Sequence, residues 1–290
     1  MNNWSPFTSF PVREYLQRIG YDLLANIIRT GPVPKHIAFI MDGNRRFAKH
    51  NELEAGEGHY AGFEAFVRLV GACAQIGVQN VTTYAFSIEN FNRKKEESEL
   101  LFTMIRTKLW DMVKDQDSIA HKNGWKIRLL GDRSLLAPDI IERIERIEEV
   151  TKHYTCMTIN ICCPYTSRDD MVQAMRRCVN EAILSPDNAE VSPTIYEANL
   201  YTGESYPLDI LVRTSGETRL SDFMCWESIT SSHIAFVPKL WPELSVWDLY
   251  KIVLKWSYRE TTQQVAVTRR VDQLPAPPPV ISVSDSRNRN

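Results

Sequence analysis

The chain of 290 residues alternates between short apolar runs and longer stretches in which apolar residues recur every three or four positions. The short runs are rich in β-branched and aromatic residues, and their length is typical of buried strands. Strands that are apolar on both faces and separated by helices indicate a parallel sheet covered on both sides. The sequence therefore predicts an α/β fold with a mostly parallel sheet of about six strands, at residues 36–41, 80–86, 126–131, 156–163, 208–214 and 233–237.

Helical periodicity fills most segments between these runs, at residues 62–77, 97–113, 137–152, 167–184 and 245–260. A further amphipathic helix is predicted at 12–30, with apolar positions along one side, among them Leu16, Ile19, Leu23, Leu24, Ile27 and Ile28. We favour packing of this side on the body of the protein over a role at a membrane surface. The Pro- and Ser-rich end lacks periodicity and is predicted to be disordered or docked on a partner. The expected division is an N-terminal helix (1–30), a catalytic domain (31–265) and a tail (266–290).

Composition narrows the function classes. The formal net charge is -2 and 43% of the residues are hydrophobic, which is ordinary for a globular protein and does not favour nucleic acid as a partner. The six cysteines show no zinc-site spacing, and no apolar run approaches the ~18 residues that span a bilayer. We therefore expect a protein on the cytosolic side whose anion sites are local.

The stretch HIAFIMDGNRRFAKH combines a strand end with charged residues. The apolar run stops before Asp42, and Gly43 and Asn44 precede two adjacent arginines, Arg45 and Arg46. Asp, Gly and Asn are common turn residues, so the first three alone fit a simple turn as well as a site. The arginines favour a bound anion, because guanidinium groups match phosphate oxygens. A carboxylate beside them suits Mg²⁺, which proteins hold with one or two carboxylates plus substrate phosphates.

Two further polar clusters follow predicted strands. The first contains Ser87, Asn90 and Arg93, and the second contains Arg213, Arg219 and Ser221. For Arg219 the alternative is a surface ion pair with Glu217 or Asp222. In parallel sheets the binding crevice lies beyond the carboxyl ends of the strands, so we expect all three clusters at one edge of the sheet.

Two other patterns carry less weight. The segment GEGHYA has the spacing of a dinucleotide fingerprint, but charged residues separate it from the preceding strand, so we reject that interpretation. His59 within it either caps a helix start or carries protons, and the structural role is favoured. Asp169 and Asp170 lack the third carboxylate of a DDxxD metal box and are predicted in the first turn of their helix, where the dipole favours acids.

The motifs HIAFIMDGNRRFAK, GHYAGF, YAFSIENFNR, RTSGETRLSDF and LWPE, in this order, resemble those of the cis-prenyltransferase family over roughly residues 34–260. Within that undecaprenyl diphosphate synthase-like family, they are most similar to the catalytic subunits of eukaryotic, and in particular fungal, dehydrodolichyl diphosphate synthase. The resemblance implies an enzyme that adds isopentenyl diphosphate units to farnesyl diphosphate, each with a Z double bond. Its product would be a long-chain polyprenyl diphosphate used for dolichol synthesis and protein glycosylation.

The resemblance also implies roles for individual residues. Asp42 would hold Mg²⁺ on the allylic diphosphate, and that group would be surrounded by Gly43, Asn44, Arg45, Arg46 and Arg93. Isopentenyl diphosphate would be seated by Arg213, Arg219 and Ser221. Leaving-group departure or proton transfer would be assisted by His59, Ser87 and Asn90. The growing chain would enter an apolar tunnel lined from segments 62–77 and 97–113.

The C-terminal region lacks the R-x-G motif that completes the isopentenyl site in single-subunit members of the family. In eukaryotic relatives a catalytically silent subunit resembling the Nogo-B receptor supplies it. The resemblance therefore implies a heteromer held peripherally on the cytosolic face of the endoplasmic reticulum or on lipid droplets. Two alternatives stay open: a non-catalytic scaffold subunit of such a complex, and an anion-binding module without turnover.

Overall fold

The structure of the chain, a computed structural model, describes residues 11–92, 95–184, 191–229 and 232–272. The sheet in this part of the chain has six strands in the order β3-β4-β2-β1-β5-β6, and every neighbouring pair is parallel. The predicted parallel sheet is confirmed, since each predicted apolar run contains or overlaps one strand. The strands are β1 (His36–Ile40), β2 (Asn80–Tyr84), β3 (Trp125–Leu130), β4 (Met157–Cys162), β5 (Ile210–Arg213) and β6 (His233–Phe236).

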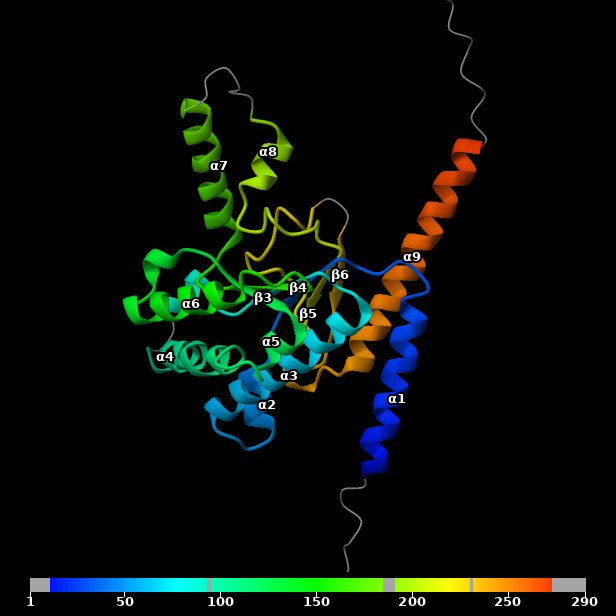
Figure 1. Cartoon of the computed structure of the whole chain (residues 1–290), viewed down its shortest axis with the longest axis horizontal. Helices are drawn as coiled ribbons and strands as arrows, with labels where there is room; N and C mark the ends of the chain where they lie inside the picture. The colour runs from blue at the N-terminus through cyan, green and yellow to red at the C-terminus, as the bar shows by residue number, and fades with distance from the viewer. Residues whose placement is uncertain (1–10, 93–94, 185–190, 230–231, 273–290) are drawn as a thin grey trace, which may run out of the picture.

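Helices lie in each connection between consecutive strands from β1 to β4 and between β4 and β5 (Figure 1). The α-helices are α1 (Pro11–Ile28), α2 (Asn44–His50), α3 (Ala55–Ile76), α4 (Lys95–Met104), α5 (Ile119–Asn123), α6 (Pro138–Thr151), α7 (Ser167–Leu184), α8 (Pro193–Ala198) and α9 (Val246–Asp272). Shorter turns are η1 (Ile88–Asn92), the π-helical η2 (Ile105–Leu109), η3 (Arg133–Leu135) and η5 (Trp241–Glu243). The helix predicted at 97–113 is thus interrupted by η2, and α3 begins seven residues earlier than position 62.

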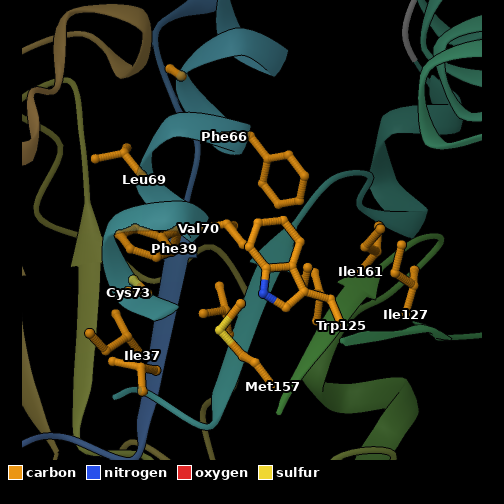
Figure 2. Packing of buried hydrophobic residues seen from close by; sticks show 14 of the residues in the cluster. Ile37, Phe39, Phe66, Leu69, Val70, Cys73, Trp125, Ile127, Met157 and Ile161 are labelled. Atoms are coloured by element: carbon orange, nitrogen blue, oxygen red, sulfur yellow. The ribbon is translucent and has the colours of Figure 1, made fainter. Parts of the chain in front are cut away.

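The main core lies between one face of the sheet and the helices α3, α6 and α9. Strand side chains alternate between the two faces, and Ile37 and Phe39 of β1 point into this core. Figure 2 shows them in one cluster with Phe66 and Leu69 of α3 and Trp125 of β3. Burial of such large apolar side chains is the dominant favourable contribution to folding.

The other face of the sheet carries a smaller core. Ala38 and Ile40 of β1 point into it, together with Phe223 and Met224 from the connection after β5. Non-helical chain therefore covers much of this face, and the sheet is covered on both faces as predicted. Helices α7 and α8 pack on one another through their own small cluster and project beyond the sheet (Figure 1).

Helix α1 lies along α9 at one side of the molecule (Figure 1). Ala25 and Ile28 are buried there, which confirms packing for part of the helix. The prediction of one packed apolar side is wrong for Ile19, Leu23 and Ile27, which are exposed because they occupy the opposite side. None of the helices in the described ranges has the length and apolar character needed to span a membrane.

The expected tail falls largely outside the described residues. Helix α9 runs to Asp272, beyond the predicted boundary at 265, and residues 273–290 are not described. The division into helix, catalytic domain and tail stays a prediction.

Candidate active site

The ends of β1, β2 and β5 lie side by side, because Ile40 pairs with both Tyr84 and Arg213. The residues that follow these strands therefore meet at one edge of the sheet, as predicted. A cavity of about 750 Å³ opens there. Among the residues that line it are eleven of the predicted site residues: Asp42, Gly43, Asn44, Arg45, Arg46, His59, Ser87, Asn90, Arg213, Arg219 and Ser221. Arg93, the remaining one, lies outside the described residues.

The carboxylate of Asp42 is held between two guanidinium groups. Arg213 donates from Nη2 to Oδ2 at 3.0 Å, and Arg46 donates from Nη2 to Oδ1 at 3.3 Å. The backbone of Asp42 is also fixed, because its carbonyl oxygen accepts from Thr214 Oγ1 at 2.7 Å and from the Trp241 N–H at 3.0 Å. The position of this carboxylate is therefore determined by contacts from three separate segments.

Arg213 is nearly buried, with 4% of its side chain exposed, and its donors are aimed by the following loop. Its Nη1 donates to Ser221 Oγ at 2.8 Å and to the Arg219 carbonyl oxygen at 2.7 Å. Its Nε is buried and has no hydrogen-bond acceptor among the described residues. A buried guanidinium beside an open cavity is suited to binding an anion, since little water competes for its charge.

Glycines bring α2 and α3 close together at the cavity. A Cβ on Gly62 would meet Asn44 Oδ1 at 2.4 Å, and one on Gly58 would meet the Asn44 carbonyl oxygen at 2.4 Å. Gly43 has φ +111 and would meet Leu240 at 3.0 Å, so a side chain there is disfavoured by conformation and by space. The glycines that the motifs contain therefore set the position of Asn44 at the start of α2.

In the second cluster, the polar side chains form hydrogen bonds with backbone groups of the same segment, residues 87–90. Ser87 Oγ accepts from the Glu89 N–H at 3.2 Å, and Asn90 Oδ1 accepts from the Ser87 N–H at 3.2 Å. These bonds shape η1 at the cavity wall. His59 lies in α3, one turn after the helix begins at Ala55, so it is not a capping residue.

The surface ion pair considered for Arg219 is present. Arg219 pairs with Glu217, and Glu217 also lies 3.8 Å from Arg46. Both members of the pair line the cavity, so the pairing and a place in the site coexist.

Several lining residues were not predicted as site residues, namely Lys49, Tyr84, Glu89, Glu217 and Trp241. Lys49 stands four positions after Arg45, and helical spacing from that arginine would have indicated it. Tyr84 donates to the Ser221 carbonyl oxygen at 3.2 Å and stacks on Phe223, and burial raises the pKa of its hydroxyl.

Most of the remaining cavity lining is apolar. A large part of it comes from α3, α4 and η2, the segments from which an apolar tunnel was predicted, and includes Phe63, Phe66, Leu101, Met104, Ile105 and Leu109. A single cavity thus joins a cationic edge to an apolar wall, which is the arrangement that an amphiphile with an anionic head group requires.

Asp42 satisfies the chemical requirements of a Mg²⁺ ligand. Its carboxylate oxygens are hard donors at the cavity surface, 30% of its side chain is exposed, and the neighbouring arginines can hold the phosphates that complete such a coordination sphere. Both oxygens accept from arginines, so a bound metal would share the carboxylate with them.

Comparison with known proteins agrees with this geometry. Residues 40–264 match the family model described as "Putative undecaprenyl diphosphate synthase". The chain is 39% identical to a dehydrodolichyl diphosphate synthase complex subunit of Schizosaccharomyces pombe, over 81% of this chain and 89% of the relative. It is 42% identical to a subunit of the same description from Homo sapiens, over 83% of this chain and 72% of the relative.

Solved structures resemble the chain in fold. The crystal structure of lavandulyl diphosphate synthase from Lavandula x intermedia, in complex with dimethylallyl diphosphate, has a TM-score of 0.68 and 29% identity, over 78% of this chain and 95% of that one. A probable undecaprenyl diphosphate synthase from Campylobacter jejuni has a TM-score of 0.62 and 27% identity over the same shares. By sequence and by fold, this chain belongs to the cis-prenyltransferase family.

Proposed function

We propose that the protein elongates farnesyl diphosphate with successive isopentenyl diphosphates to a long-chain polyprenyl diphosphate that serves dolichol synthesis. One observation carries the proposal: a single cavity places Asp42, Arg46 and Arg213 at one end and the apolar side chains of Phe66 and Leu101 on its wall. An allylic diphosphate has this same division between an anionic head and an apolar chain. The names of the relatives support the substrate class.

The chain's own residues would act chiefly through charge. Cleavage of the allylic C–O bond leaves negative charge on the departing diphosphate, so cations that bind it more strongly in the transition state lower the barrier. Arg46 and Asn44 would hold this diphosphate. Arg213 and Ser221 would seat isopentenyl diphosphate, whose double bond must lie against the allylic carbon for the new bond to form.

Asp42 would hold Mg²⁺ together with diphosphate oxygens, and the ion would supply positive charge to the leaving group when bound. His59, Ser87 and Asn90 stay candidates for assisting departure or proton transfer. The apolar wall from α3, α4 and η2 would take up the lengthening chain and keep water from the cationic intermediate.

We further propose that the active enzyme is a heteromer with a Nogo-B receptor-like subunit that supplies an R-x-G motif. The description of the relatives as complex subunits supports a partner of some kind. The assembly would lie peripherally on the cytosolic face of the endoplasmic reticulum or on lipid droplets.

The test incubates the chain, with and without its partner, with farnesyl diphosphate and labelled isopentenyl diphosphate. We expect labelled polyprenyl products with the partner present, and their loss on chelation of divalent metal or with Asp42→Ala. Full activity of the chain alone would contradict the heteromer. Product formation that neither the chelator nor the substitution alters would contradict the metal site.

A further inference from the structure

One guanidinium at the start of α7 joins two walls of the cavity. Arg168 donates from Nε to Asp222 Oδ2 at 2.7 Å and from Nη2 to Glu89 Oε1 at 2.7 Å. Asp222 directly follows Ser221, and Glu89 directly precedes Asn90. The two acceptors therefore belong to the segments that carry the third and the second predicted clusters.

Asp222 is also attached to α7 through the backbone. Its carbonyl oxygen accepts from the Ser167 N–H at 2.7 Å, and its Oδ1 accepts from the Arg168 N–H at 3.1 Å. The first N–H groups of a helix have no acceptor within the helix, and the positive end of its dipole favours a carboxylate. Asp222 therefore anchors the loop after β5 to this helix.

The backbone of the loop around Asp222 has a conformation that is unfavourable without supporting contacts. Ser221 has φ +52, Asp222 has φ +61 and Met224 has φ +45. Left-handed conformations are unfavourable for residues with a side chain and persist where surrounding contacts impose them. The contacts of Asp222 with α7 therefore help to keep Ser221 Oγ at 2.8 Å from Arg213 Nη1.

The second acceptor, Glu89, lines the cavity itself. A free carboxylate at this position would repel an incoming diphosphate, whereas one paired with a guanidinium presents much less negative charge. The Arg168 side chain is 71% exposed, which weakens both ion pairs, although the side chain of Asp222 is only 14% exposed. The consequence of the arrangement is therefore mainly local geometry and charge rather than global stability.

We propose that Arg168 is a positioning residue: by holding Asp222 it fixes Ser221 for isopentenyl diphosphate, and by pairing with Glu89 it keeps a carboxylate from opposing the bound anions. This inference rests on the function proposed above. Its signature is weaker binding of isopentenyl diphosphate with little change in the chemical step or in folding.

The test measures steady-state kinetics of the assembled enzyme with Arg168→Ala, Arg168→Lys and Arg176→Ala. Arg176 is an exposed arginine two turns further along α7 and serves as the matched control. We expect Arg168→Ala to raise KM for isopentenyl diphosphate about tenfold, to change kcat less than about threefold, and to leave Tm unchanged. Arg168→Lys should rescue only in part, because an ammonium lacks the planar fork that reaches both carboxylates. Arg176→Ala should behave as the wild type.

Two double variants distinguish the contact of Arg168 with Asp222 from its contact with Glu89. Arg168→Ala combined with Asp222→Ala should raise KM no more than the larger single effect, because both act on one loop. Glu89→Gln should recover part of the loss caused by Arg168→Ala. An active wild type with equal KM values for Arg168→Ala and Arg176→Ala, or additive effects of Arg168→Ala and Asp222→Ala, would overturn the inference. An inactive wild-type complex would instead contradict the proposed function.

Discussion

Arg213 at the end of β5 donates to the Asp42 carboxylate at 3.0 Å, across the strand pair of β1 and β5. This bond joins two clusters to which the family resemblance assigns two different diphosphates. Asp42 is the more exposed member, and Arg213 is nearly buried. The carboxylate can therefore exchange partners as ligands arrive, while the arginine stays in place.

Removal of the Asp42 carboxylate should affect catalysis far more than folding. For Asp42→Ala we expect kcat to fall about 100- to 1000-fold, the size typical for loss of one preorganised electrostatic group. Arg213 keeps Ser221 and the Arg219 carbonyl oxygen as acceptors, so the loss of stability should stay near 1–3 kcal/mol. Turnover and urea denaturation of the same samples check both parts. Activity close to that of the wild type would exclude a central role for this carboxylate.

The close approach of α2 and α3 makes Gly62 a second test. Gly62→Ala should displace the Asn44 side chain and disturb the bond from Trp241 Nε1 to the Gly62 carbonyl oxygen. We expect at least a tenfold loss of kcat/KM and a lower Tm. Gly71→Ala in the same helix is the control, because its Cβ would meet nothing within 4 Å. Equal effects of the two substitutions would show that the tight contact is irrelevant.

The apolar wall should limit product length. Met104 lines the cavity, and Met104→Trp should fill space that the lengthening chain would occupy. We expect products shorter by one or more isoprene units, seen by chromatography of the dephosphorylated products. Leu135→Trp, at an exposed position, should leave the distribution unchanged. An unaltered distribution with Met104→Trp would place the chain elsewhere.

Burial of Asp170 should give the stability of the protein a defined pH dependence. Removal from water raises the pKa of this carboxyl to about 7, and the neighbouring Glu227 carboxylate adds to the rise. Between about pH 4 and pH 7 the folded protein therefore keeps a proton that the unfolded chain has released. The stability from this group is present at low pH and decreases as the pH rises through that window, by at most about 1.4 kcal/mol per pH unit.

The contribution of His36 to stability increases as the pH rises, which opposes the contribution of Asp170. A variant is therefore needed to isolate the effect of Asp170. Burial lowers the pKa of His36 to about 4, and the unfolded chain binds a proton there below about pH 6.5. The free energy of unfolding of the wild type minus that of Asp170→Asn should therefore decrease from pH 5 to pH 8, as measured by urea denaturation. Parallel pH curves for the two proteins would contradict the raised pKa.

The strands and the place where the candidate site residues gather could be predicted from local sequence. Runs such as 36–41 are apolar on both faces, which is the pattern of a buried parallel strand, and the rule for strand ends then places Asp42 and Arg213 together. Asp170 was predicted in the first turn of its helix and lies there. Its raised pKa could not be predicted, because it depends on packing against the segment around Tyr201 and Glu227.

Other features could not be predicted because they depend on contacts between residues that are distant in the sequence. Periodicity predicted that α1 is amphipathic, but it could not show that Ile28 faces the core while Leu23 faces solvent. The bonds from Arg168 to Glu89 and Asp222 span 79 and 54 positions in sequence. No local pattern encodes such pairs, since each depends on how three separate connections fold over the sheet edge.

The most direct measurement is a crystal structure of the assembled enzyme with Mg²⁺ and a non-reactive thio analogue of farnesyl diphosphate. The account predicts that the diphosphate lies at the start of α2 against Asn44 and Arg46, with Asp42 on the metal ion and the farnesyl chain along Phe66 and Leu101. A diphosphate bound away from this edge of the sheet, with Asp42 remote from metal and ligand, would contradict it.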